Sequence, residues 1–396
     1  MNRFFLLLTL LLALFLLAGC SGGMEIESGL FVLSMAVDPA PNNCLTVTIK
    51  ALSGTQEAVG GIHTASVGNS KEDGRSTSQT GLETPEPGYI VMSATAESCL
   101  RALDLLSATT PRTLNLSQLK EIVINETLAR TQATLSILKE IHALYRAGGD
   151  AIVVVTPDDA GDFIRRQRAV LGVRLSKYLQ VLFEHFSQID TIPPDAQLSS
   201  VIEAMESGSM DAAAVYAAGN SFDNTINLSG MPETDRLPGH LPRTAPSQNE
   251  YLGSAVFSGP QMAGTLTGDE TGLLCLLMGR AKTRTFTLNG AQYKTNSATR
   301  VSRKIDKSTG ALCVHIRMNL TRIAGESSET GEDIARQIET GAAALIMRLQ
   351  AMQSDAIGFG RIAVRQYLTI SDWQNSGWPL MYANMPVQVS AQVRLK

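Results

Sequence analysis

Five cysteines carry the most versatile chemistry in this sequence, and they are scattered along it: Cys20, Cys44, Cys99, Cys275 and Cys313. No two of them have the C-x-x-C spacing from which small structural zinc sites are built. Cys313 and His315 lie two residues apart on one face of a predicted strand, but the sequence identifies no further ligands to join them. We therefore predict no metal site and no bound cofactor.

Motifs for hydrolysis and nucleotide binding are also missing. The sequence contains no G-x-S-x-G nucleophile elbow, and the turns of its first half hold neither G-x-G-x-x-G nor G-x-x-x-x-G-K-[ST] to bind a phosphate. Asp269 and Glu270 are adjacent carboxylates that open a predicted helix. Negative charge is favourable at a helix N-terminus, so we interpret them as capping residues rather than an acid–base pair. The protein is predicted not to be an enzyme.

The N-terminus carries an export signal. After Arg3, an apolar run of 15 residues extends from Phe4 to Ala18 and is interrupted only by Thr9. This is too short for a spanning helix, which needs about 20 apolar residues, but it suits a signal peptide. We therefore expect the mature protein to lie outside the cytoplasmic membrane.

The apolar run closes on Leu17-Ala18-Gly19-Cys20, which resembles the bacterial lipobox. We predict that residues 1–19 are removed and that Cys20 becomes a lipidated N-terminus carrying acyl chains such as palmitate, with Ser21-Gly22-Gly23 as a tether. Each buried CH₂ of an acyl chain contributes about 0.8 kcal/mol, so two or three chains form a stable membrane anchor. The alternative is ordinary signal-peptide cleavage with Cys20 incidental.

The other four cysteines permit three disulfide connectivities. An oxidising location outside the membrane would allow one or two bridges. Cys99 and Cys275 lie in helical patterns among apolar neighbours, which favours buried free thiols. The disulfide state of Cys44, Cys99, Cys275 and Cys313 stays open at this point.

Composition indicates a globular protein of two or three domains: 396 residues, 44% hydrophobic and 18% charged. The net charge of −4 provides no overall basic field, so nucleic acid is not an expected partner. One basic segment, residues 280–304, holds no acidic residue; its cations are Arg280, Lys282, Arg284, Lys294, Arg300, Arg303 and Lys304. Either it faces anionic lipid or an acidic partner, or it is the solvated face of antiparallel strands.

Residues 20–219 are predicted to form an N-terminal mixed α/β region, with two subdomains as one possible division. A hairpin of Leu30 to Val37 and Leu45 to Ile49 precedes a polar loop from Ser53 to Gly88 and a helix that begins near Ser93 or Thr95. Strands at Glu121 to Ile124 and Ala151 to Val155 flank a long helix from Glu126 to Arg146, which indicates a parallel pair with a crossover. Ala212 to Ala218 is a further strand.

Residues 220–250 contain four prolines among polar residues and are predicted to be a linker. Residues 251–396 are predicted to form a C-terminal α+β domain, in which an antiparallel sheet packs against a long helix. Its strands are Tyr251 to Ser258, Thr283 to Leu288, Ala291 to Ile305, Ala311 to Ile323 and Met385 to Leu395; its long helix runs from Glu329 to Met352. The fold class is α+β with several domains.

Ordered motifs along nearly the whole chain resemble the Ger(x)C lipoproteins, the C subunits of spore-germination nutrient receptors. In the first half these are the lipobox, Leu33-Ser34-Met35-Ala36-Val37-Asp38, Pro111-Arg112-Thr113-Leu114 before the strand Leu119 to Ile124, and Glu126-Thr127-Leu128-Ala129-Arg130. In the second half they are Gly253-Ser254-Ala255-Val256-Phe257, Gly264-Thr265-Leu266, Glu270-Thr271-Gly272-Leu273-Leu274, Asp355-Ala356-Ile357-Gly358-Phe359-Gly360, Trp373, Trp378 and Val393-Arg394-Leu395-Lys396. The family often has Trp-Asp directly after the lipidated cysteine, whereas Ser21-Gly22-Gly23 follows here.

The resemblance implies a non-catalytic, lipid-anchored protein on the outer face of the spore's inner membrane. It implies integral-membrane A and B subunits as partners in the response to nutrients. It brings no catalytic residues, and Cys20 is the one site residue assigned. A solute-binding lipoprotein of a transporter is the alternative; that class shares the lipobox but would need two similar lobes, and these halves differ.

Overall fold

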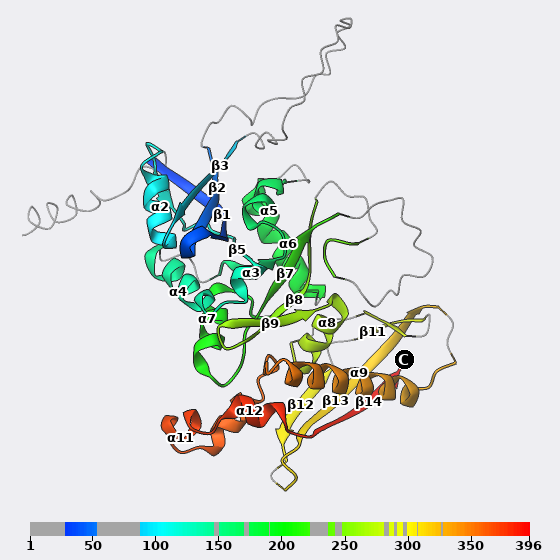
Figure 1. The fold of residues 1–396 in the computed structure, drawn as a ribbon. Helices are drawn as coiled ribbons and strands as arrows, with labels where there is room; N and C mark the ends of the chain where they lie inside the picture. Colours follow the sequence, from blue (N-terminus) through cyan, green and yellow to red (C-terminus); the bar gives the residue numbers. More distant parts are fainter. Residues whose placement is uncertain are drawn as a thin grey trace, which may run out of the picture.

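The computed structural model describes residues 28–53, 88–145, 150–169, 174–189, 191–221, 237–241, 248–280, 285–288, 291–295, 299–306, 308–325 and 328–396. Cys20, the signal peptide and the Ser21 to Gly23 tether lie outside the described residues, as does nearly all of the predicted polar loop. Figure 1 shows two sheets joined side by side, each packed with helices. This arrangement confirms the α+β, multi-domain fold class.

Nine strands form the first sheet of the described chain, in the order β3-β2-β1-β5-β6-β7-β8-β9 with β4 beside β1. They are β1 (Gly29–Ala40), β2 (Cys44–Leu52), β3 (Tyr89–Ala96), β4 (Thr113–Asn115), β5 (Glu121–Asn125), β6 (Ile152–Thr156), β7 (Ala213–Gly219), β8 (Asn249–Ser258) and β9 (Gln261–Leu266). The predicted β1–β2 hairpin and the parallel β5–β6 pair are both present. Strands β1, β5, β6 and β7 run parallel, while β8 and β9 continue the sheet in antiparallel pairing.

Helices cover both faces of this sheet. One face packs on α2 (Cys99–Ser107), α3 (Glu126–Ala129), α4 (Ala133–Tyr145) and α7 (Leu198–Ser207), and the other on α5 (Ala160–Arg166) and α6 (Leu175–Ile189). Adjacent residues of β5 pack against the helices on opposite faces of the sheet. Ile122 and Ile124 enter the first core and Val123 enters the second, as the two-residue period of a strand requires.

Two elements of the first half differ from their predictions. β3 is a strand where the sequence suggested the start of a helix; α2 instead begins after Ser98, whose side chain accepts a hydrogen bond from the Arg101 N–H at 3.2 Å. The long helix predicted from Glu126 to Arg146 is broken into α3 and α4. The Thr131 hydroxyl donates to the Leu128 carbonyl at 2.7 Å, a local bond that competes with continuation of the helix.

The predicted linker, residues 220–250, joins two neighbouring strands of one sheet. β7 and β8 pair antiparallel, with Ala213 opposite Val256 and Gly219 opposite Asn249. β8, which was predicted as a strand of the C-terminal domain, and β9, which was not predicted, therefore both extend the first sheet. The domain boundaries themselves stay a prediction.

The second sheet contains β10 (Thr285–Leu288), β11 (Ala291–Thr295), β12 (Arg300–Ile305), β13 (Leu312–Ala324) and β14 (Val387–Leu395). β11 and β12 pair with successive parts of β13, so the single strand predicted from Ala291 to Ile305 is present with an interruption. β14 lies on the opposite edge of β13. It pairs in parallel, with Leu312 opposite Val387, which departs from the all-antiparallel prediction.

The long helix α9 (Gly331–Ala351) packs on one face of the second sheet (Figure 1). Its buried stripe and that of β13 match the predicted faces: Ile334, Ile338, Leu345 and Leu349 against Leu312, Val314, Ile316, Met318 and Leu320. The shorter helices α8 (Gly268–Leu277), α10 (Gly360–Ala363), α11 (Ile370–Gln374) and α12 (Trp378–Ala383) complete this half. Within the described residues, no helix is both long and apolar enough to cross a bilayer.

A buried polar network lies inside the first half, around the carboxylate of Glu121. The Ser34 hydroxyl donates to it at 2.7 Å, the Tyr251 hydroxyl donates at 3.2 Å, and the Gln167 side-chain amide donates as well. Burial raises the pKa of Glu121, while these three bonds and the charge of buried Lys50 oppose the rise. The Lys50 ammonium donates to the Gln167 carbonyl, so Gln167 links the two charged residues.

We expect Glu121→Ala to lower the free energy of unfolding by about 2–4 kcal/mol, because it removes the acceptor that three buried donors share and leaves Lys50 without its neighbouring carboxylate. Tyr251→Phe removes two bonds of the same network, the one donated to Glu121 and the one accepted from Gln167, but it keeps the carboxylate and should cost only about 1–2 kcal/mol. Urea unfolding of both variants measures the difference. Equal losses in the two variants would show that the carboxylate is not the centre of this network.

Candidate functional site

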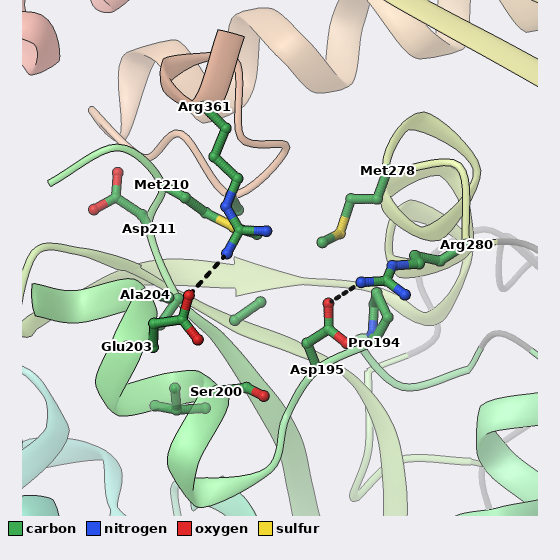
Figure 2. A pocket seen from close by; sticks show the side chains of 14 residues that line it. Pro194, Asp195, Ser200, Glu203, Ala204, Met210, Asp211, Met278, Arg280 and Arg361 are labelled. Carbon is green, nitrogen blue, oxygen red and sulfur yellow. Dashed lines mark hydrogen bonds and ion pairs between the residues drawn. The ribbon is translucent and has the colours of Figure 1, made fainter. Parts of the chain in front are cut away.

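A cavity of about 210 Å³ opens at the junction of the two halves (Figure 2). The first half contributes Pro194, Asp195 and four residues of α7, followed by residues 210–213 that lead into β7. The second half contributes Met278 and Arg280 from the end of α8, together with Ala356 and Arg361. The cavity therefore exists only because the halves meet.

Opposite charges face each other across this cavity (Figure 2). Arg280 pairs with Asp195 at 3.0 Å, and Arg361 pairs with Glu203 at 3.7 Å; each pair joins one half to the other. The four side chains are between 37% and 73% exposed. Ion pairs this exposed contribute about 0–1 kcal/mol each, so they orient the cavity walls more than they hold the halves together.

A stronger connection adjoins them, at the half-buried carboxylate of Asp211. Its two oxygens accept backbone N–H bonds from Gly259 and Asp355, both at 2.7 Å. The Asp211 N–H in turn donates to the Asp355 carbonyl at 3.2 Å. Burial raises the pKa of Asp211, and the two backbone bonds oppose that rise.

Asp355 itself closes a turn with its side chain. One carboxylate oxygen accepts the N–H groups of Gly358 and Phe359 at 3.0 and 2.9 Å; the other accepts those of Gly360 at 2.6 Å and the Trp378 indole at 3.1 Å. Burial raises the pKa of Asp355 to about 7, against the backbone hydrogen bonds and with a further contribution from the charge of Asp211. This bonding explains the spacing of the Asp355 to Gly360 motif.

The local structure requires glycine at both glycine positions of that motif. Gly358 has φ +81°, a left-handed conformation that L residues with a Cβ rarely adopt. At Gly360 a Cβ would lie 2.6 Å from the Ser209 carbonyl oxygen and 2.7 Å from the Trp378 indole nitrogen. The turn therefore fits closely against both the first half and α12.

The chemistry that this site offers is electrostatic binding. Its walls present carboxylates and guanidinium groups beside the thioethers of Met210 and Met278. Among the lining residues that are described, none is a cysteine or a histidine. The described parts of the chain contain no cluster of three or more His, Cys, Asp or Glu side chains that could hold a metal ion.

Most of the described residues that the sequence singled out lie apart from this cavity, but Arg280 of the basic segment lines it. Cys20 is outside the described residues. Glu270 forms a capping box with Thr267 and pairs with Arg348, so the capping interpretation of the Asp269-Glu270 pair is correct. His315 is exposed and its Nδ1 lies 2.5 Å from the Ser390 hydroxyl oxygen.

No disulfide joins the four described cysteines. Cys99, Cys275 and Cys313 are buried, and Cys44 is half-buried. Burial raises the pKa of the Cys99 thiol to about 12, which keeps it protonated and unreactive. The predicted buried free thiols at Cys99 and Cys275 are therefore present, and Cys275 donates to the Ile192 carbonyl at 3.5 Å.

The basic segment 280–304 does not act as one surface. Arg280 lies at the cavity, and half-buried Arg303 donates to the Ile357 carbonyl. Lys294, Arg300 and Lys304 are exposed on the second sheet, whereas Lys282 and Arg284 lie outside the described residues.

Asp211 was not identified as a functional residue from the sequence, because its partners are far away in sequence and no local motif surrounds it.

We expect Asp355→Asn to change the pH dependence of stability. The raised pKa means that the folded chain binds the proton of Asp355 more tightly than the unfolded chain does. The stabilisation of the folded state that results is fully present below about pH 4 and is lost as the pH rises through about 7. The parent should therefore lose more stability between pH 5 and 8 than the variant does, in urea unfolding at both values.

Exposed Asp104 supplies the matched control, since Asp104→Asn removes a carboxylate of the same kind and should keep the parental pH dependence. Asp355→Asn should also lower stability at pH 5 by about 1–3 kcal/mol, because its amide group places N–H donors against other donors. A variant with the parental pH dependence would show that Asp355 does not titrate in this range.

Two protein-family models match the chain in succession. The model for "Spore germination protein N-terminal domain" matches residues 22–218, and that for "Spore germination B3/ GerAC like, C-terminal" matches residues 252–396. Among solved structures, "Crystal Structure of the GerBC protein" is similar, with 14% identity, a TM-score of 0.44 and coverage of 91% of this chain and 96% of that chain. No curated protein sequence matches. Because the two models cover most of the chain in the order that its motifs predicted, the chain belongs to the GerAC-like, or Ger(x)C, family of spore germination proteins.

Proposed function

We propose that the protein is a lipid-anchored, non-catalytic subunit of a spore nutrient-germinant receptor, required for the germination response. The observation that carries this proposal is the succession of two germination-family matches over residues 22–218 and 252–396. A solute-binding lipoprotein has two similar lobes joined by crossovers. Here a nine-stranded sheet between helical layers meets a smaller sheet with one long helix, within the described chain. The fold thus gives no support to that alternative.

The proposed attachment to the membrane depends on Cys20. Only Gly19 separates it from the apolar run Phe4 to Ala18, and Ala18 and Gly19 supply the small residues that a lipoprotein signal peptidase accepts. Acylation at this cysteine would hold the mature chain at the outer face of the spore's inner membrane. Integral-membrane A and B subunits would then be its partners.

The junction cavity suits a subunit that transmits a signal rather than one that performs chemistry. It lies where the halves meet, and its two crossing ion pairs are weak and exposed. A partner or a ligand that contacts both walls could therefore alter their relative position at low energetic cost. The two hydrogen bonds between Asp211 and Asp355 limit how far the halves can separate.

We expect Cys20→Ala to abolish incorporation of radiolabelled palmitate and to release the protein from the membrane fraction or leave it as unprocessed precursor. Cys44→Ala is the matched control, since Cys44 is a half-buried cysteine within the fold. The control should label as strongly as the parent. Palmitate incorporation that survives in Cys20→Ala would place the lipid on another residue and refute this assignment.

Affinity purification of the tagged, full-length protein from spore inner membranes should recover multispanning A and B receptor subunits, identified by mass spectrometry. Deletion of the gene should abolish a nutrient response without affecting sporulation. Recovery of an ABC permease in their place would favour the solute-binding alternative. Normal germination with every nutrient, in a strain without paralogous receptors, would refute the receptor function.

A further inference from the structure

In the part of the chain that the structure describes, one face of the second sheet has no helix packed on it. α9 packs on the face that carries Leu312, Val314 and Ile316, and the alternate residues of β13 point to the opposite side. There His315 and Arg317 are exposed. We refer to this opposite side, formed by β11, β12, β13 and β14, as the outer face.

Basic side chains from all four strands gather on the outer face. They are Lys294 on β11, Arg300 and Lys304 on β12, Arg317 on β13 and Arg394 on β14, and all five are exposed. Strand register brings them together, since Arg300 is the cross-strand partner of Arg317 and Arg317 the partner of Gln392. Only three of the five belong to the basic segment visible in the sequence.

Carboxylates are missing from this face within the described residues. The remaining outward positions of the four strands are Gln292, Ser302, Cys313, His315, Asn319, Thr321, Ile323, Gln388, Ser390 and Gln392. Asp306 lies one residue beyond β12, in the turn toward β13. A protein of net charge −4 thus concentrates positive charge on one exposed sheet face, although like charges on adjacent strands cost stability.

We propose that the outer face binds the anionic surface of a lipid bilayer. The inference rests on the proposed attachment to the membrane, which would hold the chain near such a surface. Long basic side chains extend from a sheet toward a plane of headgroup phosphates, and their attraction to anionic lipid is electrostatic.

The chemistry of the face favours lipid over a protein partner. Protein interfaces usually centre on buried aromatic or aliphatic anchors. Here the positions around Arg317 are polar, and Ile323, 51% exposed, lies at the end of β13 rather than at the centre. A charged surface without an apolar centre is better suited to bind lipid headgroups than a protein partner.

The test uses a chain of residues 20–396 with Cys20→Ser, which contains every described element and carries no acyl group. It is mixed with vesicles of phosphatidylcholine alone or with about 30% phosphatidylglycerol, and binding is measured by flotation. We expect binding to the anionic vesicles only, with strong weakening between about 0.05 and 0.5 M salt.

Two triple variants, each of which removes three positive charges, test whether the outer face is the surface that binds the vesicles. Lys294→Gln, Lys304→Gln and Arg317→Gln together should lower partitioning by about 100-fold, since each basic side chain contributes about five-fold. The control combines Arg101→Gln, Lys177→Gln and Arg365→Gln, all exposed residues outside the outer face, and should bind like the parent. Circular dichroism checks that both variants fold.

Several outcomes would overturn the inference: no binding to anionic vesicles, or equal loss in both variants. The same is true if the outer-face variant binds vesicles normally but no longer co-purifies with membrane subunits, which would indicate an acidic protein partner. Concentration-dependent dimers that this variant disrupts, without vesicle binding, would indicate a second copy. Because this chain lacks the lipid, its result is independent of the palmitate test, so failure of the anchor and failure of the outer face are distinguishable.

Discussion

The pairing of β8 with β7 is the constraint on which the rest of the structure depends. Through this pairing one strand supplies residues to three hydrophobic cores of the described chain: Phe257 to the core under α2 and α4, Val256 to the core of the second sheet, and Tyr251 to the core under α5 and α6. A shift of one residue in register would exchange the faces of these side chains. The alignment of β8 therefore fixes the second half relative to the first.

The junction cavity is a product of this alignment, and its interactions form a hierarchy. Hydrogen bonds to half-buried Asp211 and buried Asp355 set the geometry, because each carboxylate is held by N–H groups from separate segments. The exposed ion pairs above them are weaker and exchange readily with water. This combination of a fixed base and adjustable walls suits a protein that responds to partners.

Local sequence patterns predicted the elements with one clean apolar face, such as β13 and α9, and the capping role of Glu270. β3 was missed because its residues are mostly half-buried, so its alternation is weak. Asp211 and Asp355 could not be recognised as a linked pair, since their side chains bind backbone groups up to 144 residues away. The outer face was only partly visible in the sequence, because strand pairing rather than proximity in sequence brings Arg317 beside Arg300 and places Arg394 on the same face.

Because β8 contributes to three cores, the N-terminal and C-terminal halves of different family members cannot be joined freely. The two family matches meet between residues 218 and 252, which suggests two exchangeable modules. A chimaera joined there would have to preserve the side chains at the β7–β8 seam and the Asp211 acceptor for its Gly259 and Asp355 donors. Substitutions on the two sides of that seam must therefore be compatible, so the halves are expected to evolve as one unit although they match separate family models.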